Sequence, residues 1–214
     1  MDQWEMGSIT MQIFICGDST AASYNPEETQ MVGWGQLLGN HLPLVSVVNL
    51  AMAGRSTKTF LQEHRLDPVS SKARPGDLML VQFAHNDENE KKPERYVPLP
   101  AFRENLSTFV RFARELKLIP VLLTPVCMRV WQGGALQPTH GEYPAAAAAV
   151  ADSLSVPMID LYTESFRMVS TLGEEGSKAL FMPDDIAHTR FAGANRFAAF
   201  TADELKRKGL IPGS

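Results

Sequence analysis

The stretch FICGDSTAAS (residues 14–23) decides how the rest of the chain is interpreted, because a hydrophobic run ends there in Gly17-Asp18-Ser19-Thr20. An apolar run that stops at glycine and small polar residues is typical of a strand that ends in a turn. Two interpretations stay open at this point. Ser19 or Thr20 caps a helix, or Ser19 is held at the strand end as a nucleophile.

Short apolar runs like this one recur along the chain and alternate with segments of helical periodicity. The expected strands are residues 12–16, 45–50, 78–83, 119–124 and 156–161. The expected helices are residues 33–42, 56–66 (with Ser56 as candidate N-cap), 99–118, 143–154 and 190–209. Alternating strands and helices predict an α/β fold, a parallel sheet of about five strands with helices on both faces. We expect a single domain over residues 1–214, since the chain shows no repeat and no linker.

Composition excludes several classes of function. The 214 residues are 44% hydrophobic and carry a net charge of −4, with no basic run interleaved with aromatics, so a nucleic-acid partner is not expected. Cys16 and Cys127 form neither a disulfide framework nor a zinc pattern. The alanine-rich stretch 145–151 is too short to span a bilayer, and the N-terminus lacks the features of a secretory signal. These features predict a cytoplasmic protein with no membrane partner.

Polar residues follow the predicted strands, where ligands bind in open parallel sheets. Ser19 follows the first strand, Gly54 the second and Asn86 the third, and Asp185 and His188 come much later. Each residue alone has a plainer explanation, such as a turn former, a solvated acid or a packed histidine. Together they fit ester hydrolysis, which needs a nucleophile, a base and donors for the oxyanion.

The roles follow from the chemistry of each group. Ser19 supplies the hydroxyl and His188 the base, while Asp185, three residues earlier, is placed to orient the imidazole. The backbone N–H groups of Ser19 and Gly54 and the side-chain amide of Asn86 would form an oxyanion hole. This chemistry requires no metal and no cofactor.

The motifs GDST (17–20), HND (85–87) and DxxHxxxxGA (185–194) resemble the SGNH (GDSL-type) hydrolase superfamily, most closely its rhamnogalacturonan acetylesterase-like carbohydrate esterases. The resemblance implies a flavodoxin-like three-layer α/β/α sandwich and the same five site residues. Ala84 departs from the family, which often has glycine there, so the pose of Asn86 is expected to differ slightly. Asp184 is a second candidate acid, but the family spacing favours Asp185.

Other residues near the predicted site have two interpretations each. Trp34 and Trp131 either stack on sugar rings or pack in the core, and Arg55 either binds an anionic galacturonate or pairs nearby. The charged patch ENEKKPER (88–95) is interpreted as a solvated loop. A metal set of His85, Asp87, Asp184 and His188 matches no familiar ligand spacing, so no metal site is predicted.

These observations favour a serine acetylesterase that deacetylates small oligosaccharides, which the resemblance implies are pectin-derived (rhamnogalacturonan), through an acyl-enzyme. A lipid- or thioester-directed esterase or lysophospholipase is the alternative enzyme. A carbohydrate-binding protein that keeps the fold without catalysis is the alternative outside enzymes. The sequence leaves the oligomeric state open between monomer and homodimer.

Overall fold

The computed structural model describes residues 11–211 and contains one five-stranded parallel sheet. Its strands are β1 (Met11–Gly17), β2 (Val45–Asn49), β3 (Leu78–Gln82), β4 (Ile119–Leu123) and β7 (Met158–Ile159). They lie in the order β2-β1-β3-β4-β7, and every neighbouring pair is parallel. This is the flavodoxin-like order that the resemblance implied.

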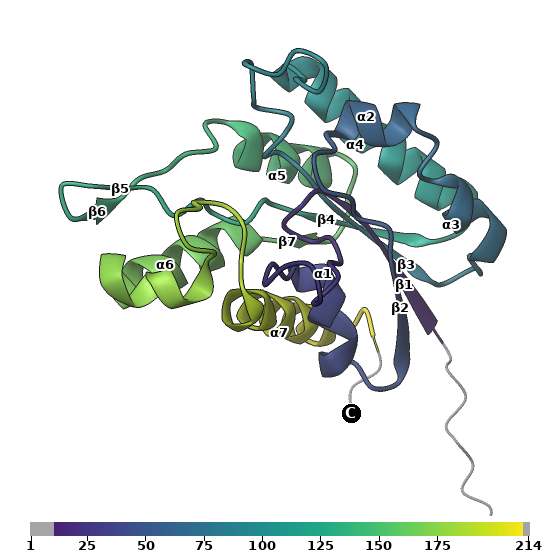
Figure 1. Cartoon of the computed structure of the whole chain (residues 1–214). Helices are drawn as coiled ribbons and strands as arrows, with labels where there is room; N and C mark the ends of the chain where they lie inside the picture. Colours follow the sequence, from purple (N-terminus) through teal and green to yellow (C-terminus); the bar gives the residue numbers. More distant parts are fainter. Residues whose placement is uncertain (1–10, 212–214) are drawn as a thin grey trace, which may run out of the picture.

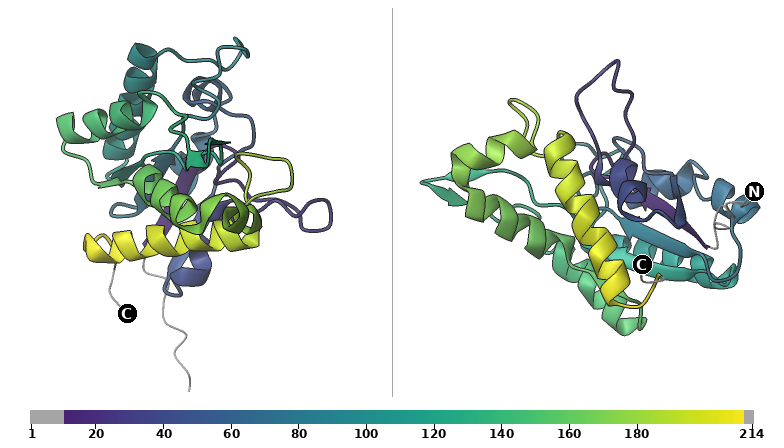
Figure 2. Two further views of the ribbon diagram at one scale, coloured as in Figure 1. Left: turned by 90° about the vertical axis from the view of Figure 1, so that its left-hand side faces the viewer. Right: turned by 90° about the horizontal axis from the view of Figure 1, so that it is seen from below.

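Helices cover both faces of the sheet (Figure 1). On one face lie α2 (Thr57–Gln62), α3 (Asp67–Lys72), α4 (Leu99–Glu115) and α5 (Tyr143–Ser153). On the other lie α1 (Trp34–Leu37), α6 (Leu161–Ser177) and α7 (Phe191–Arg207). Figure 2 shows α6 and α7 beside one another across that second face. The predicted three-layer α/β/α sandwich is confirmed.

The side chains of the apolar strands pack into two separate hydrophobic cores, one on each face of the sheet. Successive strand residues point to opposite faces, so Phe14 and Cys16 pack with α2–α5 while Ile13 and Ile15 pack with α1, α6 and α7. All four side chains are fully buried. Burial on both faces explains why these strands lack the apolar–polar alternation of a one-sided sheet.

The structure differs from the predicted elements in the last third of the chain. The fifth strand is only two residues long, and α6 was not predicted. Asp160 begins α6 by accepting a hydrogen bond from the Thr163 amide at 3.1 Å. Gly173, with φ of +73°, interrupts the helix and masks its periodicity in the sequence. The short helix α3 and the hairpin of β5 (Trp131–Gln132) and β6 (Ala135–Leu136) were also missed.

The candidate N-cap is confirmed, because the Ser56 hydroxyl accepts from the Thr59 amide and Thr59 caps in return. The predicted helix 56–66 nevertheless ends early, where His64 adopts a φ of +54°. Among residues 11–211, no helix combines the length and the apolar character needed to cross a membrane.

Candidate active site

Ser19 lies in the turn that follows β1, next to the point where the strand order reverses between β1 and β3. No helix begins at this turn, since α1 starts only at Trp34, so the helix-cap interpretation is wrong. The fully buried Asp18 holds the turn, because its Oδ1 accepts from the Thr20 amide at 2.9 Å and the Thr20 hydroxyl at 2.8 Å. Ser19 itself is 9% exposed.

Backbone hydrogen bonds bring the distant segment around His188 to this turn. The Val32 amide donates to the Thr189 carbonyl at 2.9 Å, and the Thr189 hydroxyl donates to the Val32 carbonyl at 2.7 Å. Two residues after Val32, the Trp34 amide donates to the Thr20 carbonyl at 2.9 Å. The loop before α1 therefore ties the residue after His188 to the residue after Ser19.

Asp185 and His188 form a directly bonded pair. Asp185 Oδ2 lies 2.7 Å from His188 Nδ1, while Oδ1 accepts from the amides of Ala187 at 2.8 Å and His188 at 2.9 Å. Burial raises the pKa of Asp185, but these hydrogen bonds outweigh it and hold the pKa below its usual value. The carboxylate is thus ionised and fixed in orientation. Asp184 is exposed, so Asp185 is the acid that contacts the imidazole.

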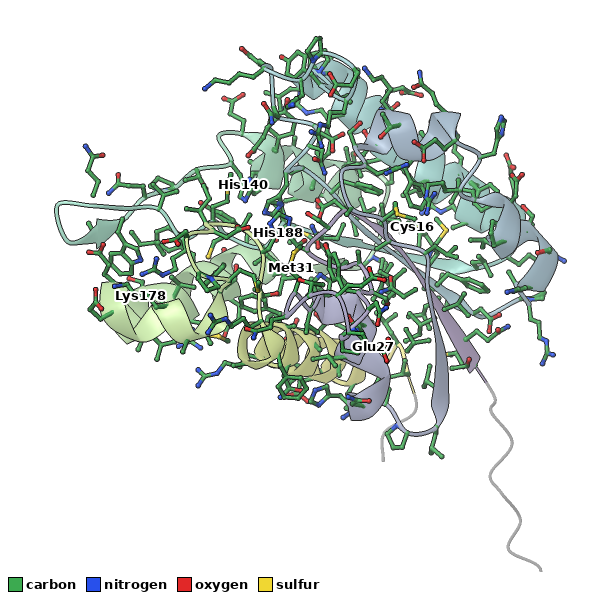
Figure 3. All side chains as sticks on the ribbon, viewed as in Figure 1. Cys16, Glu27, Met31, His140, Lys178 and His188 are labelled. Carbon is green, nitrogen blue, oxygen red and sulfur yellow. The ribbon has the colours of Figure 1, made fainter. Side chains whose placement is uncertain are left out.

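The imidazole of His188 has no second hydrogen-bond partner among residues 11–211. His188 nevertheless acts electrostatically on Asp18, which holds the Ser19 turn. Burial raises the pKa of Asp18 to about 6, and the hydrogen bonds from Thr20 and the charges of His140 and His188 act against that rise. Hydrogen bonds between catalytic groups often tighten only when substrate binds. Figure 3 shows His188 and His140 in the same central part of the view, and the charges of both act on the buried side chains of Asp18 and His85.

Two of the predicted oxyanion donors, the Gly54 backbone amide and the Asn86 side-chain amide, lie outside the Ser19 turn. They are close to one another, because Arg95 contacts both residues. Gly54 adopts a φ of +80°, a conformation that glycine takes without steric cost. Asn86 is 9% exposed, and its Nδ2 donates to the Arg55 carbonyl at 2.9 Å. An amide nitrogen carries two hydrogens, so Asn86 keeps one for a substrate oxyanion.

Arg95 is a site residue that sequence reasoning missed. Its Nη1 donates to Asn86 Oδ1 at 2.9 Å and to the Gly54 carbonyl at 3.4 Å, so it bridges the two candidate donors. The interpretation of residues 88–95 as a solvated loop is wrong at this position, where the side chain is 24% exposed. A turn in which the Arg95 amide donates to the Lys92 carbonyl brings Arg95 back to the site. No sequence motif indicates this turn, so Arg95 could not be recognised from the sequence.

Two histidines with buried side chains, His85 and His140, pack against each other, and His85 directly precedes Asn86. His85 is buried with Nδ1 3.6 Å from Asp18 Oδ2, and burial together with the charges of His140 and His188 lowers its pKa well below the usual value. The ring of His140 packs edge-on against His85 at 4.4 Å between centroids. His140 also lies 2.9 Å from Glu88 and 2.8 Å from the Val126 carbonyl, which secures the long loop before α5.

Two further features shape the segment that carries Asn86. Ala84 has a φ of +154°, outside the region that residues with a Cβ prefer, where the family often has glycine. The buried Asp87 accepts from the amide of Thr57 at 2.9 Å and from its hydroxyl at 2.5 Å, which joins this segment to the start of α2. Burial raises the pKa of Asp87 to about 7. Within the described residues, no group of three or more His, Cys, Asp or Glu is arranged to hold a metal ion.

The structure favours the packing or pairing interpretation for Trp34, Arg55 and Trp131 over the sugar-binding one. Trp34 is fully buried and its Nε1 donates to Gln82 Oε1 at 2.8 Å, so it cannot stack on a sugar. Arg55 does not offer a free guanidinium, because its Nε lies 2.9 Å from Glu63 Oε2. Trp131 lies in the β5–β6 hairpin and packs on the small apolar cluster beside α6, which supports the core interpretation.

Comparisons with known proteins identify the family of the chain. The sequence profile described as the GDSL-like lipase/acylhydrolase family matches residues 15–194. The probable rhamnogalacturonan acetylesterase YesY of Bacillus subtilis (strain 168) is 36% identical over 204 residues, which cover 92% of this chain and 94% of YesY. The rhamnogalacturonan acetylesterase RhgT of the same strain is 37% identical over 215 residues, which cover 94% of this chain and 91% of RhgT. The crystal structure of the Bacillus subtilis protein YxiM has a TM-score of 0.84 at 28% identity, covering 93% of this chain and 57% of that one.

Proposed function

The chain belongs to the GDSL-like lipase/acylhydrolase family, and we propose that it is a serine esterase that removes O-acetyl groups from acetylated oligosaccharides. The single observation that carries this proposal is the Asp185–His188 pair. It leaves the second imidazole nitrogen available as a base beside the turn that holds Ser19.

The reaction follows from these groups. Ser19 Oγ attacks the acetyl carbonyl carbon while His188 takes the hydroxyl proton, and Asp185 stabilises the imidazolium that forms. The oxyanion accepts hydrogen bonds from the backbone amides of Ser19 and Gly54 and from Asn86 Nδ2. Collapse expels the sugar hydroxyl, which takes the proton from His188. A water molecule then hydrolyses the acetyl-enzyme by the same route and releases acetate.

Covalent labelling tests the catalytic assignment. We expect an organophosphonate to label the wild type and not Ser19→Ala, because only a serine activated by a base reacts with it at neutral pH. His188→Ala should also lose nearly all turnover and keep its fold, checked by circular dichroism. Absence of labelling in the wild type would favour the carbohydrate-binding alternative, and wild-type turnover in either variant would contradict the assignment.

The substrate class rests on the relatives YesY and RhgT, whose names state rhamnogalacturonan acetylesterase activity. We propose pectin-derived, acetylated rhamnogalacturonan oligosaccharides for this chain, and a cytoplasmic location stays a prediction. Acetate release from acetylated pectin and xylan oligosaccharides is the direct measurement. A chain-length series of p-nitrophenyl esters separates the lipid-directed alternative, because an acetylesterase prefers acetate and an enzyme with an acyl channel prefers octanoate.

A further inference from the structure

Asp18 and His85 each directly precede a predicted catalytic residue. Asp18 comes before Ser19, in the turn after β1. His85 comes before Asn86, in the segment after β3, and β1 and β3 are neighbouring parallel strands. The side chain of Asp18 is fully buried and that of His85 is 7% exposed. A contact between them therefore joins the two segments whose N–H groups must converge on one oxyanion.

The facing atoms of this pair have no other partner. Asp18 Oδ2 lies 3.6 Å from His85 Nδ1, just beyond the usual range of a hydrogen bond. Within the described residues, neither Asp18 Oδ2 nor either ring nitrogen of His85 has a hydrogen-bond partner, and all three atoms are buried. Because a buried polar atom without a hydrogen bond is destabilising, a small movement that closes this gap is favoured.

The charge states of the two groups suit such a hydrogen bond. Burial, together with the charges of His140 and His188, lowers the pKa of His85 well below its usual value, so the imidazole is neutral. Burial raises the pKa of Asp18 to about 6, so the carboxyl is mainly ionised at neutral pH. A neutral imidazole carries one N–H and one acceptor nitrogen. With its proton on Nδ1, His85 donates to a carboxylate, and such a bond is stronger than one between neutral groups.

Thr20 offers a second link between the same segments, but its hydroxyl is shared. It lies 2.8 Å from Asp18 Oδ1 and 3.0 Å from Gln82 Oε1 at the end of β3. A hydroxyl has one hydrogen to donate, so it serves one of these acceptors at a time. When Thr20 holds the Asp18 carboxylate, its link to Gln82 is given up, and the contact between Asp18 and His85 remains.

The backbone before His85 requires such an anchor. Ala84 has a φ of +154°, where a residue with a Cβ is disfavoured. A conformation of this kind persists only where the surrounding contacts hold it. On the far side of Asn86, Asp87 is hydrogen-bonded to the start of α2. On the near side, His85 is the side chain placed to hold the segment.

We propose that His85 is a positioning residue for the esterase reaction and that it acts by donating a hydrogen bond from Nδ1 to Asp18. This bond aligns the two oxyanion donors that follow, Ser19 and Asn86. The inference deepens the proposed function and rests on it. Neither His85 nor Asp18 touches the substrate in this role. Loss of the bond lets the two segments shift relative to one another, which weakens hydrogen bonds that are strongest in the transition state.

Hydrolysis of p-nitrophenyl acetate by matched variants tests the proposal. We expect His85→Leu to lower kcat about 10- to 100-fold, because a displacement of about 1 Å in an active site costs up to about 10² in rate. KM should change less than about twofold, because acylation and deacylation use the same donors. His85→Asn places an amide N–H near the position of Nδ1 and should recover most of the kcat. The control is His41→Leu, which removes a histidine that contacts Asn195 of α7 at 3.0 Å and should leave kcat unchanged.

A double-mutant cycle with Asp18→Asn tests the pair itself and guards against misfolding. In His85→Leu, the Asp18 carboxylate is buried without its facing donor, which is destabilising. Asp18→Asn removes the charge and keeps an oxygen that accepts from Thr20. We therefore expect it to raise the melting temperature of His85→Leu by more than it changes that of the wild type. The double variant should keep the low kcat, because the link between the two segments is still absent.

The outcomes separate this proposal from the proposed function. An inactive wild type, or wild-type turnover in Ser19→Ala, would refute the esterase function and the positioning role together. Turnover that needs Ser19 but is unchanged in His85→Leu would overturn the positioning role alone. Equal losses of kcat in His85→Leu and His85→Asn, or melting temperatures that show no coupling between His85→Leu and Asp18→Asn, would also overturn it.

Discussion

Replacing Arg95 with methionine should lower kcat although Arg95 touches no reacting atom in the proposed mechanism. Arg95 Nη1 donates to Asn86 Oδ1 at 2.9 Å, and Asn86 Nδ2 donates to the Arg55 carbonyl at 2.9 Å. These two bonds fix which way the amide points. Without Arg95, the amide of Asn86 is free to rotate and lose its alignment with the oxyanion.

Two limits set the expected magnitude. A hydrogen bond to a charged group contributes about 1.5–3 kcal/mol, which corresponds to about a 10- to 150-fold change in rate. Loss of an entire oxyanion donor costs about 10²–10³ in kcat. Arg95→Met should therefore fall within the first range and below the loss caused by Asn86→Ala. Methionine keeps much of the length of the apolar stem, so packing is disturbed little.

The assay is a double-mutant cycle with p-nitrophenyl acetate as substrate. In the Asn86→Ala background, Arg95→Met should have almost no further effect on kcat, because the group it orients is gone. Thermal melting of each variant checks the fold, and Arg111→Met is the control. Additive losses in the double variant, or a change confined to KM, would refute the positioning role of Arg95.

Three further predictions concern single residues. Asp185→Asn should lower kcat about 10⁴-fold, because an amide at that position donates to His188 Nδ1 and puts the imidazole proton on the wrong nitrogen; a loss below tenfold in p-nitrophenyl acetate hydrolysis would contradict the pair's role. Gly54→Ala should reduce the free energy of unfolding by about 1–3 kcal/mol, because φ there is +80° and the new Cβ lies 3.3 Å from Arg95 Nη1; urea denaturation measures this, and an unchanged midpoint would refute it. The pKa of Asp87 is about 7 in the folded protein, against an ordinary value of 3.8. Because the folded state holds this proton more tightly, the protonated carboxyl stabilises the fold fully below pH 3.8, and this stabilisation is lost as the pH rises through about 7. Asp87→Asn should remove that loss, making the variant more stable relative to the wild type at pH 8 than at pH 5 in urea denaturation; equal differences at both pH values would count against it.

The sequence by itself determined the strands of the sheet and the order of the candidate site residues. A strand that is buried on both faces is apolar along nearly its whole length. Runs such as 12–16 and 78–83 can therefore be recognised as strands from the sequence alone. In a parallel sheet all carboxyl ends lie on one edge, and the residues after those runs therefore meet. Ser19, Gly54 and Asn86 could be located in this way.

Only the tertiary structure decided what the surrounding side chains do. Trp34 is buried because α1 packs against the sheet, where its indole hydrogen is donated to Gln82 at the end of β3. Arg55 is paired because the end of α2 brings Glu63 beside it. Arg95 bridges Gly54 and Asn86 from within a charged stretch that carries no motif. Such contacts join residues that no local pattern relates, since side-chain pairing depends on how separate loops approach one another and not on propensity or periodicity.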